Sequence, residues 1–425
     1  MTESRRPLLS PDLRLLLVSM ILANIGSHMV MPLMALYVSS LGATVSQVGL
    51  FFTLSSIFPL LFQIVGGWMS DTLGRIRAIS IGSLGGMASY IFLFLAPTFW
   101  WLLLSECLAS VARSLVGPSF SAFTAEESEE GKRGRTFGAT QTLFLVVAVI
   151  GPALGGWVAD RYGFKAVILI AGGLYFSATV LRLAMARRVA ARAKPGESSG
   201  ASGLRIQMAG MLALMLAGGV MTWIVLIDGV RDISFRLSFE LMPVYLEQLR
   251  GISLAQIGLL GSIVGVGSML LTPLSGWIVD HRDERTAIAL GTISVTAGFA
   301  LFLRARTFGG FAVAWGLFGA SWGLMDPAYQ TLISRAVPSR MLGTAFGFLG
   351  TSIGLFSLLA PWLGGQLWTR VTPDAPFALT MVIAGASIIP IWIKFHLPKA
   401  QPSAGPASPA AAEASLPEPL RTDGL

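Results

Sequence analysis

The chain has 425 residues, of which 54% are hydrophobic and 12% charged, and its mean hydropathy is +0.71. Soluble domains carry roughly 25% charged residues, so the composition excludes an ordinary soluble domain and indicates a membrane protein. The formal net charge of +8 would suit a nucleic-acid binder. Because the basic residues gather in alternate connections, as membrane topology requires, we expect no nucleic-acid partner.

Apolar runs of about 20 residues, the length that crosses a bilayer core, follow one another along the chain. They are too long for barrel strands and lack two-residue alternation. The predicted fold is therefore an all-α membrane protein with twelve transmembrane helices in two similar six-helix bundles. The runs lie at residues 13–38, 46–69, 78–96, 99–124, 135–159, 164–186, 222–247, 254–280, 286–304, 308–335, 342–367 and 375–396.

Most of the 30 lysines and arginines lie at the two ends of the chain and in every second connection between spans. Arg182 is assigned to one of these connections. The positive-inside rule then predicts a multi-pass protein of the cytoplasmic (inner) membrane with both termini in the cytoplasm. The first apolar run is long, lacks a clear cleavage site and leads directly into another span. We expect it to be a retained helix.

The sequence repeats itself at an offset of 209 residues. Gly67-Trp68-x-x-Asp71 recurs as Gly276-Trp277-x-x-Asp280, and the same shift relates many other landmarks. Parallel repeats of this kind build alternating-access transporters, with the substrate site between the bundles. The predicted organisation is a cytoplasmic N-terminus (1–12), an N-terminal bundle (13–186), a cytoplasmic linker (187–205), a C-terminal bundle (206–396) and a disordered cytoplasmic tail (397–425).

Residues 206–221 are apolar but have no partner in the first repeat. They extend the seventh helix upstream or lie in the membrane interface. An additional span would reverse the charge pattern of the whole second half, so we do not expect one.

A charged motif ends the second apolar run, with Gly67, Asp71, Gly74 and Arg75 in the order G-x-x-x-D-x-x-G-R. Here the chain resembles the major facilitator superfamily, whose loop signature has these residues. The resemblance implies that Asp71 contacts the eleventh helix when the cytoplasmic side is closed. The second copy keeps Asp280 but loses the turn glycine. The alternative is a solvated loop whose charges only set topology.

The fourth run contains Arg113 at membrane depth, where an ion costs about 2.5–3.5 kcal/mol and must face a cavity or a partner. Glu106, Ser110 and Arg113 are spaced to share one helical face. The surrounding R-x-x-x-G resembles the family's second motif, which implies a role in proton movement. A structural ion pair between Glu106 and Arg113 is the alternative.

The fifth run contains Gly151, Pro152, Gly155 and Gly156 in the order G-P-x-x-G-G. This is similar to the core of the antiporter motif of drug–proton exchangers, and the resemblance favours export over import. Small residues also allow ordinary close packing of helices, which is the alternative explanation.

The seventh run carries five charges at membrane depth, Asp228, Arg231, Asp232, Arg236 and Glu240. Four of them, Asp228, Asp232, Arg236 and Glu240, recur every four residues. We predict that this stripe lines the central cavity, with Asp232 and Glu240 as the first candidates for proton coupling. A structural ion network is the alternative. The remaining candidates are His28 and Asn24 for the cavity, and Trp315, Trp322, Asp326, Tyr329, Gln330 and Gln141 for a substrate wall.

The expected function is export of small hydrophobic or amphipathic molecules in exchange for protons, by a protein that acts as a monomer in the lipid bilayer. The chain has no nucleophile–base set, no phosphate loop, one cysteine and three histidines. We therefore expect no enzyme activity, no cofactor and no metal. The alternatives are a proton-coupled importer or lipid transporter on the same fold, and a membrane sensor or scaffold that does not transport.

Overall fold

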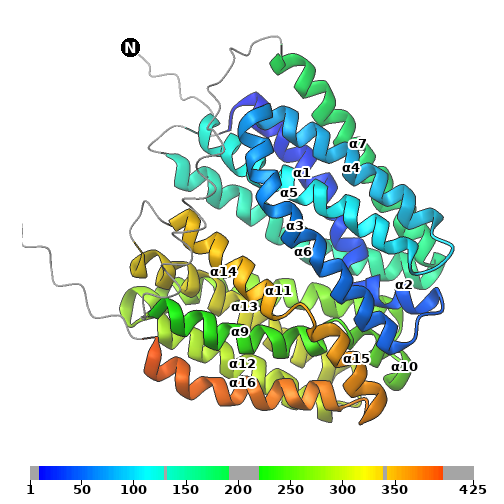
Figure 1. Cartoon of the computed structure of the whole chain (residues 1–425), viewed down its shortest axis with the longest axis vertical. Helices are drawn as coiled ribbons and strands as arrows, with labels where there is room; N and C mark the ends of the chain where they lie inside the picture. The colour runs from blue at the N-terminus through cyan, green and yellow to red at the C-terminus, as the bar shows by residue number, and fades with distance from the viewer. Residues whose placement is uncertain (1–8, 129–131, 191–219, 338–341, 396–425) are drawn as a thin grey trace, which may run out of the picture. The chain divides into compact units, whose positions relative to one another are not determined.

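The computed structural model describes residues 9–128, 132–190, 220–337 and 342–395 (Figure 1). For residues 63–72, 189, 190, 220, 342–344 and 348 only the backbone is described. Every regular element in these ranges is a helix. Most of residues 206–221, whose role the sequence left open, lie outside the described residues.

The N-terminal bundle is built from the first repeat. Its first span is broken after Val30 by a short 3-10 helix, and its fifth and sixth spans are long and continuous. The elements are α1 (Pro11–Val30), η1 (Met31–Leu33), α2 (Met34–Ser40), α3 (Val45–Leu73), α4 (Arg75–Leu95), α5 (Trp101–Glu127), α6 (Arg133–Tyr162) and α7 (Phe164–Ala190).

The C-terminal bundle repeats this plan, with its first span again broken, between α9 and α10. Its fifth span is also interrupted, ahead of Pro361. The elements are α9 (Val220–Phe239), α10 (Met242–Arg250), α11 (Leu254–His281), α12 (Glu284–Arg304), α13 (Phe308–Ala336), α14 (Leu342–Phe356), α15 (Ala360–Arg370) and α16 (Ala375–Lys394).

The repeat is visible in the helix caps. Thr44 and Gln47 form a capping box at the start of α3, and Ser253 and Gln256 form the same box at the start of α11. Each side chain satisfies a backbone N–H that has no partner within the helix. The repeated glutamine therefore has a local structural cause, because it fixes where the second span of each bundle begins.

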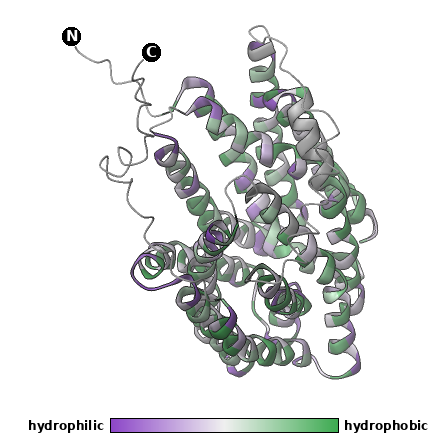
Figure 2. Cartoon of the chain, turned by 60° about the vertical axis from the view of Figure 1, so that its left-hand side comes forward, coloured by the Kyte–Doolittle hydropathy of each residue, from purple (hydrophilic) through white to green (hydrophobic). Residues whose placement is uncertain are grey.

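Ten of the described spans are long and apolar enough to cross a membrane. The span formed by α5 and the span formed by α9 and α10 are not among them, and both carry charged residues at membrane depth. Together they complete twelve spans. Figure 2 shows hydrophobic residues along the helices and hydrophilic ones gathered mostly near helix ends, as a bilayer requires.

Arg182, which the sequence assigned to a cytoplasmic connection, lies instead inside the N-terminal bundle and is 2% exposed. Its guanidinium donates to the hydroxyls of Ser19 and Ser83, at 3.1 and 2.8 Å, and lies over the ring of Tyr175. The charge is buried among neutral acceptors of α1 and α4, which ties α7 to both helices.

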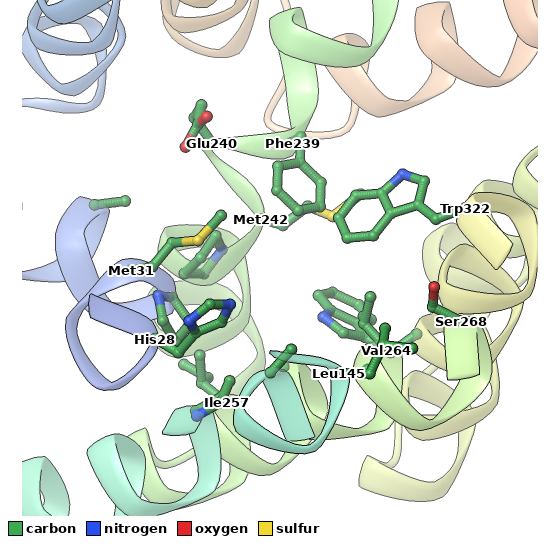
Figure 3. Close-up of a pocket in the computed structure, with 18 residues that line it drawn as sticks. His28, Met31, Leu145, Phe239, Glu240, Met242, Ile257, Val264, Ser268 and Trp322 are labelled. Carbon is green, nitrogen blue, oxygen red and sulfur yellow. The ribbon is translucent and has the colours of Figure 1, made fainter. Parts of the chain in front are cut away.

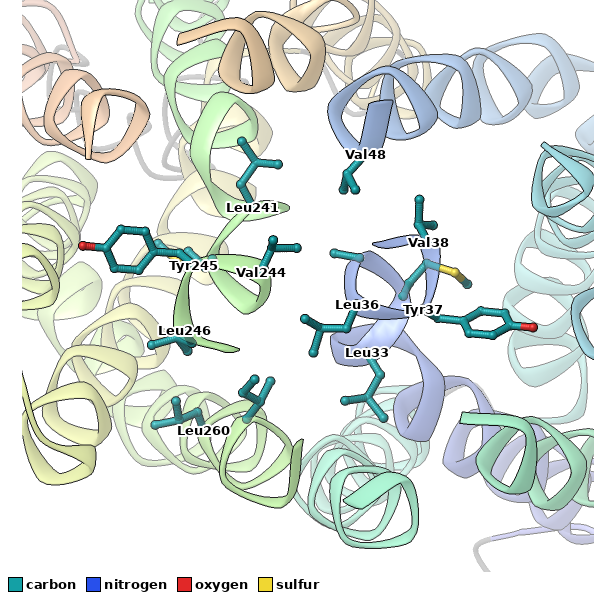
Figure 4. Close-up of a cluster of buried hydrophobic side chains, with 14 of the residues drawn as sticks. Leu33, Leu36, Tyr37, Val38, Val48, Leu241, Val244, Tyr245, Leu246 and Leu260 are labelled. Carbon is teal, nitrogen blue, oxygen red and sulfur yellow. The ribbon is translucent and has the colours of Figure 1, made fainter. Parts of the chain in front are cut away.

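The two bundles meet at the end that holds α2, α10 and α15 (Figure 1). This end is called the outer end from here on, because the topology predicted from the sequence places it outside the cell. Buried side chains of both repeats face one another there, including Leu36 and Val48 of the first and Val244 and Leu260 of the second (Figure 4). Away from the outer end the ribbons of the two bundles diverge, toward the start of α1 and the end of α16.

Candidate functional site

A cavity of about 230 Å³ lies between the bundles, lined by α1, η1, α2 and α6 from one side and α9, α10, α11 and α13 from the other (Figure 3). Its walls are almost entirely apolar. The polar side chains among the lining residues include His28, Glu240 and Ser268. Interfaces between bundles are where transporters of this architecture bind their substrates.

Glu240 enters the cavity from the break between α9 and α10. The residue one repeat earlier is Met31, at the break between α1 and α2, and it also lines the cavity (Figure 3). Among the described residues the Glu240 carboxylate has no hydrogen bond or ion pair. Charged groups near it include Arg236 in its own span and Glu106 from the opposite bundle.

Aromatic rings form the wall beside Glu240. Trp322 lies 5.6 Å from the ring of Phe239 and 6.2 Å from that of Phe235, and these two phenylalanines stack at 4.7 Å. Trp315 also lines the cavity, so the structure places both predicted tryptophans in the wall. Phe239 and Met31 also line the cavity but were not predicted from the sequence. Two signals could have found them, because Met31 lies one repeat before Glu240 and Phe239 directly precedes it.

His28 and Asn24 occupy successive turns of α1, as their spacing predicts. His28 lines the cavity, and its Nδ1 lies 2.9 Å from the backbone carbonyl of Asn24. The Asn24 amide donates to the carbonyl of Met20 at 2.8 Å. Of this pair, only His28 presents an ionisable group to the cavity.

The face of α5 carries the expected polar group. Arg113 donates to the carboxylate of Glu106 at 3.1 Å and to the hydroxyl of Ser110 at 2.9 Å. The Arg113 side chain is 58% exposed and that of Glu106 19%. The ion pair that the sequence analysis gave as the alternative role of Arg113 is therefore present, and the role in proton movement stays a prediction.

The charged stripe of α9 does not lie on one wall, which corrects the sequence prediction. Asp232 and Arg236 form the expected ion pair at 2.8 Å. Asp228 is instead 5% exposed and turned into the C-terminal bundle, where it accepts from the hydroxyl of Tyr329 and pairs with Arg231 at 3.1 Å. Residues four apart advance about 40° around a helix, so Asp228 and Glu240 differ by about 120°.

The other wall candidates lie outside the cavity lining. Tyr329 belongs to the polar group around Asp228, where the guanidinium of Arg231 lies over its ring at 5.2 Å. Asp326, Gln330 and Gln141 are exposed and are not among the lining residues.

The loop motif is described in part. Only the backbone is described at Gly67 and Asp71, so the predicted contact of the Asp71 side chain stays a prediction. Gly74 has a φ of 85° between α3 and α4, which requires glycine at the turn. Asp280, at the corresponding end of α11, is exposed.

Beside this motif an ion pair is conserved by the repeat with its charges reversed. Arg75 at the start of α4 pairs with Glu126 at the end of α5, at 3.1 Å. The equivalent residues of the second repeat are Glu284 and Arg335, which pair at 2.5 Å. Each pair joins the third and fourth spans of its bundle at the end away from the outer contact.

The G-P-x-x-G-G segment packs α6 against two neighbours. A Cβ on Gly151 would lie 2.5 Å from Cβ of His28, and one on Gly155 would lie 2.1 Å from the carbonyl oxygen of Met29. Gly156 faces α11, where a Cβ would lie 2.7 Å from Cα of Gly258. Pro152 lines the cavity. The segment therefore adjoins both the cavity and the contact between the bundles.

Two bundles related by a sequence repeat, with an apolar cavity between them whose described lining includes the carboxylate of Glu240, define a secondary transporter of the membrane and not an enzyme. The described residues contain no group of three or more His, Cys, Asp or Glu that could hold a metal ion. The chain belongs to the Major Facilitator Superfamily, whose sequence profile matches residues 16–245 and 229–424.

Related proteins include a "Multi-drug resistance efflux pump PmrA homolog" of Lactococcus lactis, which is 25% identical over 379 residues, covering 87% of this chain and 91% of that protein. The "Multidrug resistance protein MdtG" of Serratia proteamaculans is 24% identical and covers 87% and 90%. A solved bacterial homologue of the iron transporter ferroportin, in an inward-facing state, has a TM-score of 0.73 at 14% identity, covering 91% and 99%.

Proposed function

We propose that the protein exports small hydrophobic or amphipathic molecules in exchange for protons, by alternating access between its two bundles. It acts as a monomer in the cytoplasmic membrane with both termini inside the cell. The names of its relatives support efflux of several drugs. The basic residues in alternate connections support the orientation.

The observation that carries the proposal is the Glu240 carboxylate in an apolar, aromatic cavity. Glu240 is partly buried, and a carboxylate in apolar surroundings is stabilised by a counter-charge or a proton. Glu240 has neither an ion pair nor a hydrogen bond among the described residues, so a proton and a cationic group of a substrate compete for it. Such competition couples the two movements, because one must leave before the other binds.

The walls support the substrate class. Trp322 and Phe239 offer flat aromatic faces, and the other lining residues are mainly aliphatic. These surfaces bind apolar parts of a substrate through contacts that require no particular orientation, and an aromatic face also attracts a cation. The ion pairs Glu106–Arg113 and Asp232–Arg236, one in each bundle, are partners that the Glu240 charge can engage as the bundles move.

The test measures ethidium, a lipophilic cation, in everted membrane vesicles that contain the protein. An imposed proton gradient, acidic inside, should drive ethidium into vesicles with the wild-type protein. Glu240→Gln should slow this accumulation at least tenfold, because the amide cannot exchange a proton. Asp232→Asn and Arg113→Ala should reduce it as well.

Glu247→Gln is the matched control, since Glu247 is an exposed residue of α10 only two turns away. Its rate should equal that of the wild type. Proton-driven accumulation by Glu240→Gln at the wild-type rate would show that the proton site lies elsewhere. If the wild-type protein accumulates ethidium only in right-side-out vesicles, import replaces export.

A further inference from the structure

At the outer end, the two bundles approach each other through glycine in two places related by the repeat. A Cβ on Gly258 of α11 would lie 2.4 Å from the carbonyl oxygen of Pro152 in α6. A Cβ on Gly49 of α3 would lie 2.3 Å from the carbonyl oxygen of Pro361 in α15. The backbones are therefore in direct contact across the interface at both places.

A hydrogen bond crosses the interface beside each of these contacts. The N–H of Ala153, which follows Pro152, donates to the hydroxyl of Ser262 at 3.0 Å. The N–H of Trp362, which follows Pro361, donates to the hydroxyl of Thr53 at 3.0 Å. Donors and acceptors are each 209 residues apart, so the two bonds are one contact made twice.

The position of the donors explains why an outside acceptor is used. Trp362 lies in the first turn of α15, where backbone N–H groups have no acceptor within the helix. Ala153 directly follows a proline inside α6, where the ring removes one helical hydrogen bond and bends the backbone. A hydroxyl from the opposite bundle supplies an acceptor at each place.

Both hydroxyls are buried, with Ser262 5% and Thr53 4% exposed. The contact between the Ser39 hydroxyl and the Gln248 amide, at the same end, is exposed. Water competes for an exposed hydrogen bond but not for a buried one. The two buried hydrogen bonds therefore stabilise the contact between the bundles more than the exposed one does.

We propose that Ser262 and Thr53 are positioning residues that stabilise the closed outer end, each by accepting a backbone hydrogen bond from the opposite bundle. Separation of the bundles breaks both bonds together, because they lie at repeat-related places. The inference goes beyond the proposed function, since it depends on neither the substrate nor the coupling ion.

Closure can be measured directly by the distance between two spin labels at the outer end. Cys107→Ser removes the native thiol, and Thr98→Cys and Arg306→Cys then place one label on an exposed outer connection of each bundle. Ser262→Ala and Thr53→Val are compared, singly and together, with the labelled parent, without substrate and at fixed pH.

Each single variant should raise the ratio of open to closed outer ends about fivefold, and the double variant about 25-fold, from the net value of a neutral hydrogen bond. Ser262→Thr and Thr53→Ser, which keep the hydroxyl, should restore the parental ratio. Thr142→Val removes an exposed hydroxyl of α6 that bonds its own helix, and should change nothing.

An unchanged distance distribution in the double variant, with the protein eluting as a single species, would overturn the proposal. So would an equal shift in the hydroxyl-keeping variants, because it would assign the effect to packing. Neither result depends on drug transport. A protein that closes as proposed but moves no ethidium would contradict the proposed function alone.

Discussion

Gly258→Ala should open the outer end of the protein without unfolding either bundle. The added Cβ would lie 2.4 Å from the carbonyl oxygen of Pro152 and 2.6 Å from Cα of Gly156. Ordinary contacts of this kind begin near 3.4 Å. Since all these atoms belong to backbone, no side chain can rotate away, and the helices must separate by about 1 Å.

Overpacking of this size costs about 1–3 kcal/mol, and only in the conformation that brings α6 and α11 together. Because each 1.4 kcal/mol is a factor of ten, the ratio of closed to open outer ends should fall about 5- to 140-fold. The label pair described above reports this ratio. Ethidium accumulation should fall as well, because a protein held open on one side cannot complete its cycle.

Gly276→Ala is the control, because a Cβ at this position of the same helix meets open space. It should leave the distance distribution unchanged and, if anything, stabilise α11 by up to about 1 kcal/mol. Gly49→Ala should behave as Gly258→Ala does. If Gly258→Ala kept the parental distances, the close approach of the two backbones would not be what holds the outer end closed.

Two further predictions concern the second repeat. Glu284→Arg should lower the apparent Tm, because it places two cations together. Adding Arg335→Glu should recover most of the lost stability, about 1 kcal/mol, because the first repeat uses this charge order. A double variant that recovers no stability would refute a direct pair. Burial raises the pKa of the Asp283 carboxyl, but hydrogen bonds from Thr286 and Arg285 outweigh this and hold the pKa below its ordinary value of 3.8. Asp283→Ala should therefore destabilise the protein by about 1 kcal/mol at neutral pH. The difference in stability between the two proteins should shrink as the pH falls through and below 3.8, because a carboxyl with a depressed pKa adds stability only while it is ionised. A difference in thermal melts that does not change with pH would contradict this.

The fold was accessible from the sequence because its two strongest constraints are written there directly. Span length follows from bilayer thickness, and the 209-residue offset fixes which spans correspond. Gln47 and Gln256 recur because each closes a capping box, so even this minor landmark has a local cause. Local causes of this kind survive in a repeat and can be recognised without a structure.

The site was accessible only in part. Glu240, His28 and both tryptophans line the cavity, whereas Asp228 turns into its own bundle. A four-residue spacing indicates neighbours along a helix and does not fix one direction over three turns. The contacts of Ser262 and Thr53 could not be predicted from the sequence, because a single hydroxyl in an apolar span can bond to its own helix as well as to a neighbouring one.

The exposed hydrogen bond between Ser39 and Gln248 joins residues one repeat apart. A contact between equivalent positions lies on the axis that relates the two bundles. In a dimer of two identical subunits, a residue on such an axis would contact only its own copy. Identical side chains on such an axis must be both donor and acceptor for one another. Fusion of the two bundles into one chain lifts this constraint, and here it allows an amide to meet a hydroxyl.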